Sequence, residues 1–126
     1  MKVGLIGAGN IGQHFATRIL ASEHELVIFD LNKDVMERFV KLGAQAASSV
    51  QDLASKVETV FLCLPVPAAV KSVAQELVKG TMMRTLIDLS TTGPSVTKEV
   101  YEIISPKKIG FVSAPVSGGT VAAQHG

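Results

Sequence analysis

Three glycines and one aspartate in the first thirty residues have the types and spacing of a dinucleotide-binding motif. Gly7, Gly9 and Gly12 form a G-x-G-x-x-G pattern. Such a motif carries an acidic residue ~20 residues further along the chain, and Asp30 lies close to that position. The first glycine makes a tight turn, the second lets the backbone approach a pyrophosphate, and the third lets a helix pack closely on a strand. A carboxylate at the position of Asp30 accepts hydrogen bonds from ribose hydroxyls.

The segments around these residues are the ones that the motif requires. Residues 3–6 and 26–29 are apolar runs that predict strands, and residues 11–21 predict a helix. The apolar residues expected on the core face of that helix are Ile11, Phe15, Ile19 and Leu20. Its N-terminus would direct N–H groups and a positive dipole end at the phosphates. A glycine triplet alone is explained by an ordinary turn, but here strand, helix, strand and acid agree. The expected cofactor contacts are Gly7, Ala8, Gly9, Asn10, Ile11, Gly12, Asp30, Leu31 and Asn32.

The rest of the chain continues the alternation of strands and helices. The apolar patterns predict strands at 44–46, 59–64, 85–88 and 109–113. They predict helices at 33–41, around 67–78 and at 94–104, and a short helix that begins at 50 and has apolar positions as far as 57. We expect Asn32 to cap the first of these helices, Gly43 to end it, and Val35, Met36, Phe39 and Val40 to face inward. Ser48 or Ser49 would cap the second.

This alternation predicts one α/β domain over residues 1–126, a Rossmann-type doubly wound parallel sheet with strand order 3-2-1-4-5-6. Ligands of such sheets lie outside the carboxyl ends of the strands. The loops expected there are 7–12, 30–32, 64–67, 89–93 and 114–119. Asp88, at a strand end, is expected to organise the loop that contains Ser90 and not to act as an acid catalyst.

Composition narrows the class of protein. A net charge of +1 without a basic cluster gives no indication of nucleic acid or an acidic membrane as a partner. No stretch approaches the ~20 apolar residues of a membrane-spanning helix. The single cysteine, Cys63, lies in an apolar run and is expected to be a small buried hydrophobe. One cysteine cannot form an intramolecular disulfide, which fits a reducing compartment, and we expect the protein in the cytoplasm. No spacing of His, Cys, Asp and Glu indicates a metal site.

Four stretches carry a resemblance to a known family. They are 4–12 (GLIGAGNIG), 63–65 (CLP), 88–94 (DLSTTGP) and 114–119 (APVSGG). In this order they resemble the N-terminal domain of the β-hydroxyacid dehydrogenases, which include 3-hydroxyisobutyrate dehydrogenase and 2-hydroxy-3-oxopropionate reductase. Two positions depart from the family pattern, since Ile11 stands where methionine is usual and Ser113 where aspartate is common.

The resemblance implies that hydride passes between a small 3-hydroxy acid and a nicotinamide cofactor. By the same resemblance, Leu64, Pro65 and Thr91 would line the nicotinamide half of the cofactor. Ser117, Gly118 and Gly119 would hold the substrate carboxylate, since a hydroxyl and glycine-rich backbone N–H groups together can form an anion nest. Asp30 favours NAD over NADP because a carboxylate repels a 2′-phosphate, although Lys33 lies close by.

The main departure from the family is length. Its members continue into a helical second domain that supplies a catalytic lysine, and no residue here matches that lysine. We therefore expect this chain to be the cofactor-binding part of an enzyme, without that C-terminal domain, with no catalytic residue of its own and inactive alone. The uncovered edge of the sheet would favour self-association. Two alternatives stay open: a non-catalytic nucleotide-binding or sensing module, and another reductase of the same superfamily, such as a pyrroline carboxylate-type reductase.

Overall fold

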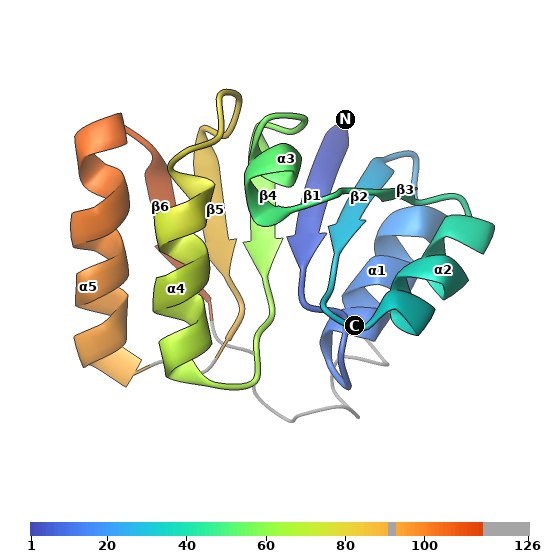
Figure 1. Cartoon of the computed structure of the whole chain (residues 1–126), viewed down its shortest axis with the longest axis horizontal. Helices are drawn as coiled ribbons and strands as arrows, with labels where there is room; N and C mark the ends of the chain where they lie inside the picture. Colours follow the sequence, from blue (N-terminus) through green and yellow to red (C-terminus); the bar gives the residue numbers. More distant parts are fainter. Residues whose placement is uncertain (91–92, 115–126) are drawn as a thin grey trace.

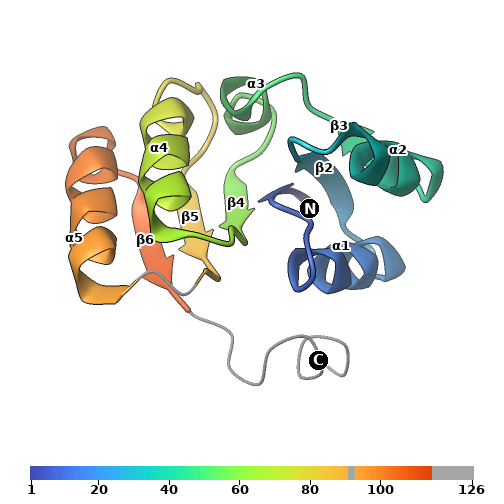
Figure 2. The same ribbon diagram turned by 60° about the horizontal axis from the view of Figure 1, so that its bottom comes forward.

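The described part of the chain, residues 1–90 and 93–114 of a computed structural model, forms a parallel sheet with helices on both faces (Figure 1). The strands are β1 (Lys2–Ile6), β2 (Glu25–Phe29), β3 (Gln45–Ala46), β4 (Thr59–Leu62), β5 (Thr85–Asp88) and β6 (Gly110–Ser113). Their order is β3-β2-β1-β4-β5-β6, which confirms the predicted doubly wound topology. Because all pairs are parallel, the strands end at one edge, which Figure 2 turns toward the viewer.

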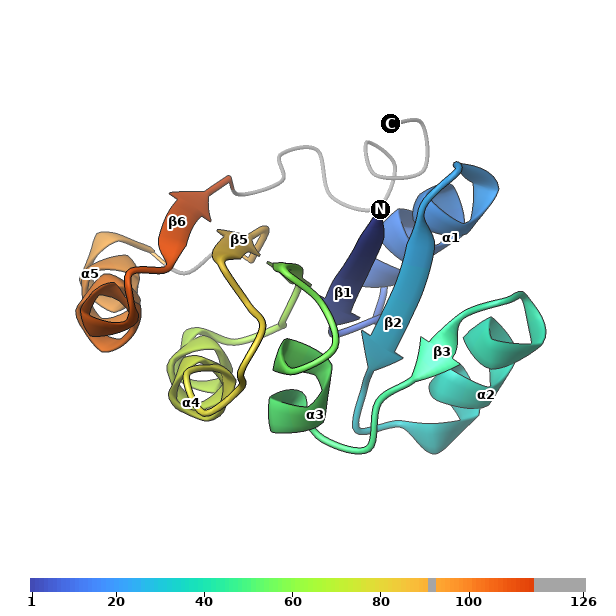
Figure 3. The same ribbon diagram turned by 90° about the horizontal axis from the view of Figure 1, so that it is seen from above.

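The helices divide between the two faces of the sheet. They are α1 (Gly12–Ala21), α2 (Lys33–Lys41), α3 (Val50–Ala54), α4 (Pro67–Leu77) and α5 (Gly93–Ile104), with a 3-10 turn, η1 (Ser105–Lys107), after α5. In Figure 3, α3, α4 and α5 lie on one side of the sheet and α1 on the other. Over the described ranges, no helix is long and apolar enough to cross a bilayer.

Local signals explain where two of these helices begin. Asn32 Oδ1 accepts hydrogen bonds from the N–H groups of Asp34 and Val35, at 3.0 and 3.3 Å. Ser49 Oγ accepts from the Asp52 N–H at 3.0 Å, so Ser49 and not Ser48 caps α3. A short polar side chain at this position satisfies an N–H group that the helix itself leaves unpaired. Both predicted caps are thereby confirmed.

Two apolar layers hold the sheet between its helices. One packs strand residues such as Val60, Leu62 and Leu86 against α3, α4 and α5. The other packs strand residues such as Leu5 and Ile28 against α1 and α2. Side chains of a strand point alternately to the two faces, so the apolar runs of the central strands are buried on both sides. This arrangement leaves the carboxyl edge of the sheet as the place where loops can form a site.

Four predicted details are wrong. β4 ends at Leu62 and not at 64, because its partner β1 ends at Ile6, the residue opposite Leu62. α3 ends at Ala54, and Val57 is buried in the turn after it. Val40 is 44% exposed and does not face inward. Ile11 lines a cleft at the carboxyl edge instead of joining the core face of α1.

Candidate functional site

The glycine turn after β1 is closed on one side and open on the other. Gly7 has φ +92°, and a Cβ there would clash with the carbonyl oxygen of Cys63. A Cβ at Gly12 would clash with the carbonyl oxygen of Gly7, so this turn packs against the start of α1 without a side chain. At Gly9, by contrast, no described atom lies within 4 Å of the place that a Cβ would take. The backbone at Gly9 is therefore open to close approach by a ligand.

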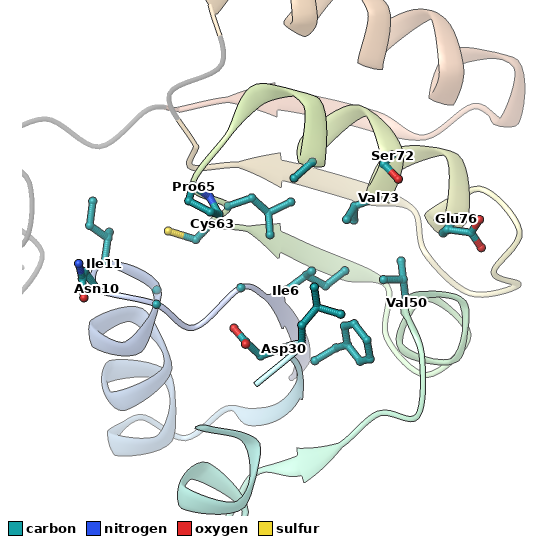
Figure 4. Close-up of a pocket in the computed structure, with 17 residues that line it drawn as sticks. Ile6, Asn10, Ile11, Asp30, Val50, Cys63, Pro65, Ser72, Val73 and Glu76 are labelled. Atoms are coloured by element: carbon teal, nitrogen blue, oxygen red, sulfur yellow. The ribbon is translucent and has the colours of Figure 1, made fainter. Parts of the chain in front are cut away.

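The carboxylate of Asp30 lies beside this turn, at the end of β2. Its Oδ2 accepts a hydrogen bond from the Ala8 N–H at 2.7 Å, and its Oδ1 accepts one from the Asn32 N–H at 2.8 Å. Asp30 thus joins the end of β2 to the glycine turn, although 22 positions separate it from Ala8 in the chain. Figure 4 shows its carboxylate directed toward the turn.

The N-terminus of α1 differs from those of α2 and α3. Its N-cap residue is Ile11, which makes no side-chain capping bond, and the first turn contains no acidic residue. The positive end of the helix dipole is therefore not neutralised by the helix's own side chains. Such an end, next to an open glycine turn, suits a phosphate group.

A cleft of about 750 Å³ runs along the carboxyl ends of β1, β2 and β4 (Figure 4). One side is formed by the glycine turn and the end of β2, and the other by the start of the loop after β4 and by α4. The lining residues are Ile6, Gly7, Gly9, Asn10, Ile11, Gly12, Phe29, Asp30, Leu31, Val50, Cys63, Leu64, Pro65, Ala69, Ser72, Val73 and Glu76. Its size suits a small organic ligand, and most of its lining is apolar.

The loop after β4 is tied to the loop after β5. The Leu64 N–H donates to Ser90 Oγ at 2.8 Å, and the Ser90 N–H donates to Asp88 Oδ1 at 2.9 Å. Asp88 is fully buried, and Ser90 is 4% exposed. The prediction that Asp88 organises this loop is confirmed, and the same contacts fix the backbone of Leu64 at the side of the cleft.

Cys63 is only half-buried, at the side of the cleft, so it is less enclosed than the sequence predicted. Burial, with a smaller contribution from the charge of Asp88, raises the pKa of its thiol to about 11. The thiol is therefore protonated near neutral pH and is a poor nucleophile. Within the described ranges, no cluster of three or more His, Cys, Asp and Glu side chains is placed to hold a metal ion.

Most of the predicted cofactor contacts come together at the cleft. Of the residues expected from the motif, Ala8 donates its N–H to Asp30, Asn32 caps α2, and the others line the cleft. Leu64 and Pro65 also line it. Thr91, Ser117, Gly118 and Gly119 lie outside the described residues. Sequence reasoning missed the α4 side, namely Ala69, Ser72, Val73 and Glu76, together with Phe29 and Val50.

The open glycine turn, the uncapped end of α1 and the fixed carboxylate fit a dinucleotide. Residues 2–126 match the family model of the NAD binding domain of 6-phosphogluconate dehydrogenase. The chain belongs to this family. This membership agrees with the dinucleotide-binding motif that residues 7–12 and Asp30 form in the structure.

Individual proteins similar to this chain include curated 3-hydroxyisobutyrate dehydrogenases. The chain is 36% identical to a probable mitochondrial enzyme of this name from Dictyostelium discoideum and 35% identical to the mitochondrial enzyme from Rattus norvegicus. Each match covers 98% of this chain but only 40% and 38% of the relative, so the chain spans about two fifths of their length. The solved 3-hydroxyisobutyrate dehydrogenase of Mycobacterium tuberculosis has the same fold over 98% of this chain and 43% of its own, with a TM-score of 0.90 at 21% identity.

Proposed function

We propose that this chain binds NAD(H) in the cleft, as the cofactor-binding part of a dehydrogenase that acts on a small 3-hydroxy acid. The observation that carries this proposal is the Asp30 carboxylate, held at 2.7 Å from the Ala8 N–H beside the open glycine turn. A pyrophosphate at the turn would leave the adjoining ribose within reach of that carboxylate. The substrate class rests on the motif resemblance and on the names of the curated relatives.

The charges at the end of β2 support NAD over NADP. Asp30 places a carboxylate where the 2′-phosphate of NADP would lie, and the following Leu31 and Asn32 provide no cation. The nearest cation in sequence is Lys33, which begins α2 and is exposed. A carboxylate and a phosphate at this spacing repel each other, whereas ribose hydroxyls donate to the carboxylate.

Each group of residues then has a role in binding and orientation. Backbone N–H groups around Gly9 and the first turn of α1 would bind the pyrophosphate. Leu64, whose N–H is held by Ser90, and the adjacent Pro65 would exclude water from one side of the nicotinamide, which when bound accepts or donates the hydride. From the resemblance, Thr91 would contact the same half of the cofactor, and Ser117, Gly118 and Gly119 would bind the substrate carboxylate.

In this mode of binding, no described side chain of the cleft would accept a proton from a substrate hydroxyl at the nicotinamide. The Cys63 thiol stays protonated because its pKa is about 11. The two carboxylates of the cleft would lie elsewhere, Asp30 at the ribose and Glu76 at the end of the cleft away from the glycine turn. The resemblance assigns this role to a lysine that has no counterpart among these 126 residues. We therefore expect the 126-residue chain to bind NADH but to show negligible dehydrogenase turnover. Clear turnover of 3-hydroxyisobutyrate by this chain would contradict the assignment.

Calorimetric titration with NADH and, separately, with NADPH tests the cofactor site. We expect NADH to bind at least about tenfold more tightly, and Asp30→Ala to weaken NADH binding by loss of the ribose contact and of the Ala8 bond. Asp34→Asn, a change of an exposed acid in the first turn of α2, is the matched control and should leave binding unchanged. If neither NADH nor NADPH binds, the proposal fails, and a role in which the fold serves without a dinucleotide ligand is favoured.

Self-association of the chain is a further part of the proposal. Phe61, Ile87 and Val112 are direct neighbours across β4, β5 and β6 and share the face opposite α4 and α5. Val112 is 50% exposed, and Phe61 and Ile87 are only partly buried. A row of apolar side chains on a sheet face favours contact with another apolar surface. The cytoplasmic location also remains a proposal, and several relatives are named as mitochondrial.

A further inference from the structure

The cleft continues past Asp30, away from the glycine turn. Figure 4 shows Asn10 and Ile11 at one end, Val50 and Glu76 at the other, and Asp30 between them. In the proposed mode of binding, the pyrophosphate lies at the turn and the ribose at Asp30. The base attached to that ribose therefore enters the far end of the cleft, between the end of β2 and α4.

The lining of this far end is apolar apart from α4. Its apolar lining includes Phe29 from the end of β2, Val50 from α3 and Val73 from α4. Apolar side chains from three separate elements suit the flat faces of a purine ring. Such contacts would accept any purine and would not distinguish one base from another.

Glu76 adds a charged acceptor to this region, in which Ser72 is the other polar side chain from α4. Its carboxylate is half-exposed, and Lys79 Nζ contacts Glu76 Oε1 at 3.3 Å. A carboxylate has two oxygens and about four acceptor positions, so one contact with Lys79 leaves capacity for another donor. A base that presents an amino group at its edge would supply that donor. A base with an oxo group there would place a second acceptor against the carboxylate. The N–H of its adjacent ring nitrogen does not lie where the amino group of adenine would, so the base would have to shift to donate to Glu76.

We propose that Glu76 selects the base of the bound dinucleotide by accepting a hydrogen bond from the exocyclic amino group of adenine. This inference rests on the proposed cofactor site. Glu76 is then a specificity-determining residue that disfavours a dinucleotide whose base carries an oxo group at the same position. Because Glu76 is half-exposed and keeps its contact with Lys79, the wrong base would lose one hydrogen bond without leaving a buried charge unpaired, so the expected discrimination is moderate.

The test compares NADH with its hypoxanthine analogue, in which an oxo group replaces the 6-amino group of adenine. Calorimetry on the 126-residue chain should give NADH about tenfold tighter binding than the analogue. In Glu76→Gln the side-chain amide can donate to the oxo group, so the analogue should bind more tightly than to the wild type and the preference should disappear or reverse. Glu58→Gln is the matched control, because Glu58 is also a half-exposed carboxylate paired with a cation, Arg84, and does not line the cleft.

Two results would overturn the inference while the cofactor site stands. One is a wild-type chain that binds NADH and the analogue equally, and the other is an unchanged preference in Glu76→Gln. A wild-type chain that binds neither compound overturns the proposed function together with this inference. Since the wild-type comparison needs no substitution, the inference stays testable even if a variant fails to fold.

Discussion

Substitution of Gly9 by alanine separates cofactor binding from folding. No described atom lies within 4 Å of the new Cβ, and the φ of Gly9 is not in the left-handed region. The free energy of unfolding should therefore change by less than about 1 kcal/mol, and could rise because alanine restricts the unfolded chain. The methyl group would nevertheless stand on the open side of the turn, where the pyrophosphate has to approach the backbone.

The expected loss of affinity follows from the bonds that the methyl group would prevent. A hydrogen bond from a backbone N–H to a charged group contributes about 1.5–3 kcal/mol, so the loss of one such bond should weaken NADH binding roughly 10- to 150-fold. Calorimetry measures the affinity, and urea unfolding measures the stability. Gly12→Ala should behave differently, because its Cβ would clash with the backbone of Gly7 and destabilise the fold.

Gly110→Ala provides the matched control for Gly9→Ala. Its Cβ would meet Arg84 and Thr85 atoms at 3.7 and 3.9 Å, which are ordinary contacts, and it lies in β6, away from the cleft. Stability and NADH affinity should both stay close to those of the wild type. The reasoning is refuted if Gly9→Ala binds NADH as tightly as the control, or if it unfolds as readily as Gly12→Ala.

Three further predictions follow from single contacts. Because the pKa of Cys63 is raised from 9.0 to about 11, the unfolded chain loses this proton first, so stability should fall as pH rises from about 9 to 11. Over that pH range, the free energy of unfolding in urea should fall less steeply with pH for Cys63→Ala than for the wild type. An equal pH dependence in the two proteins would contradict the assigned pKa. Ser90→Ala leaves the Leu64 N–H without its acceptor, so the free energy of unfolding measured in urea should fall by about 1–3 kcal/mol. Ser90→Thr keeps a hydroxyl and should restore the stability. Equal stability of all three proteins would show that the bond contributes little. Val112→Lys should shift sedimentation of the chain toward the monomer, and a wild-type chain that is already monomeric at high concentration would exclude self-association through this face.

Local chemistry is sufficient to predict much of this molecule from its sequence. Gly12 is required by close contact with the backbone of Gly7, earlier in the same turn, and Asn32 caps α2 through N–H groups two and three residues away. These signals depend on neighbours in the chain, so the element order and the glycine turn could be predicted. The strand order followed as well, because the dinucleotide-binding motif occurs in a sheet with one recurrent topology.

Element ends and side-chain directions depended on partners distant in sequence. β4 ends at Leu62 because β1 provides no further residue to pair with, although the apolar run continues to Leu64. Ile11 has the spacing of a core residue of α1. It lines the cleft instead, because it is the N-cap residue, which still belongs to the glycine turn at the edge of the cleft. Neither outcome could be deduced from periodicity, which describes one element at a time.

The sequence by itself thus determined the presence of a dinucleotide motif, its acid and the sheet that carries it. Only the tertiary structure decided what lies opposite that motif. The apolar spacing of Val70, Val73, Ala74, Leu77 and Val78 predicts the core face of α4, but it does not say that Val73 also lines the cleft or what the flanking residues approach. Packing of α4 beside β4 and α3 brings Glu76 to the same cleft as Val50 and Asp30. That juxtaposition arises from contacts between separate elements, and for this reason no local pattern contains it.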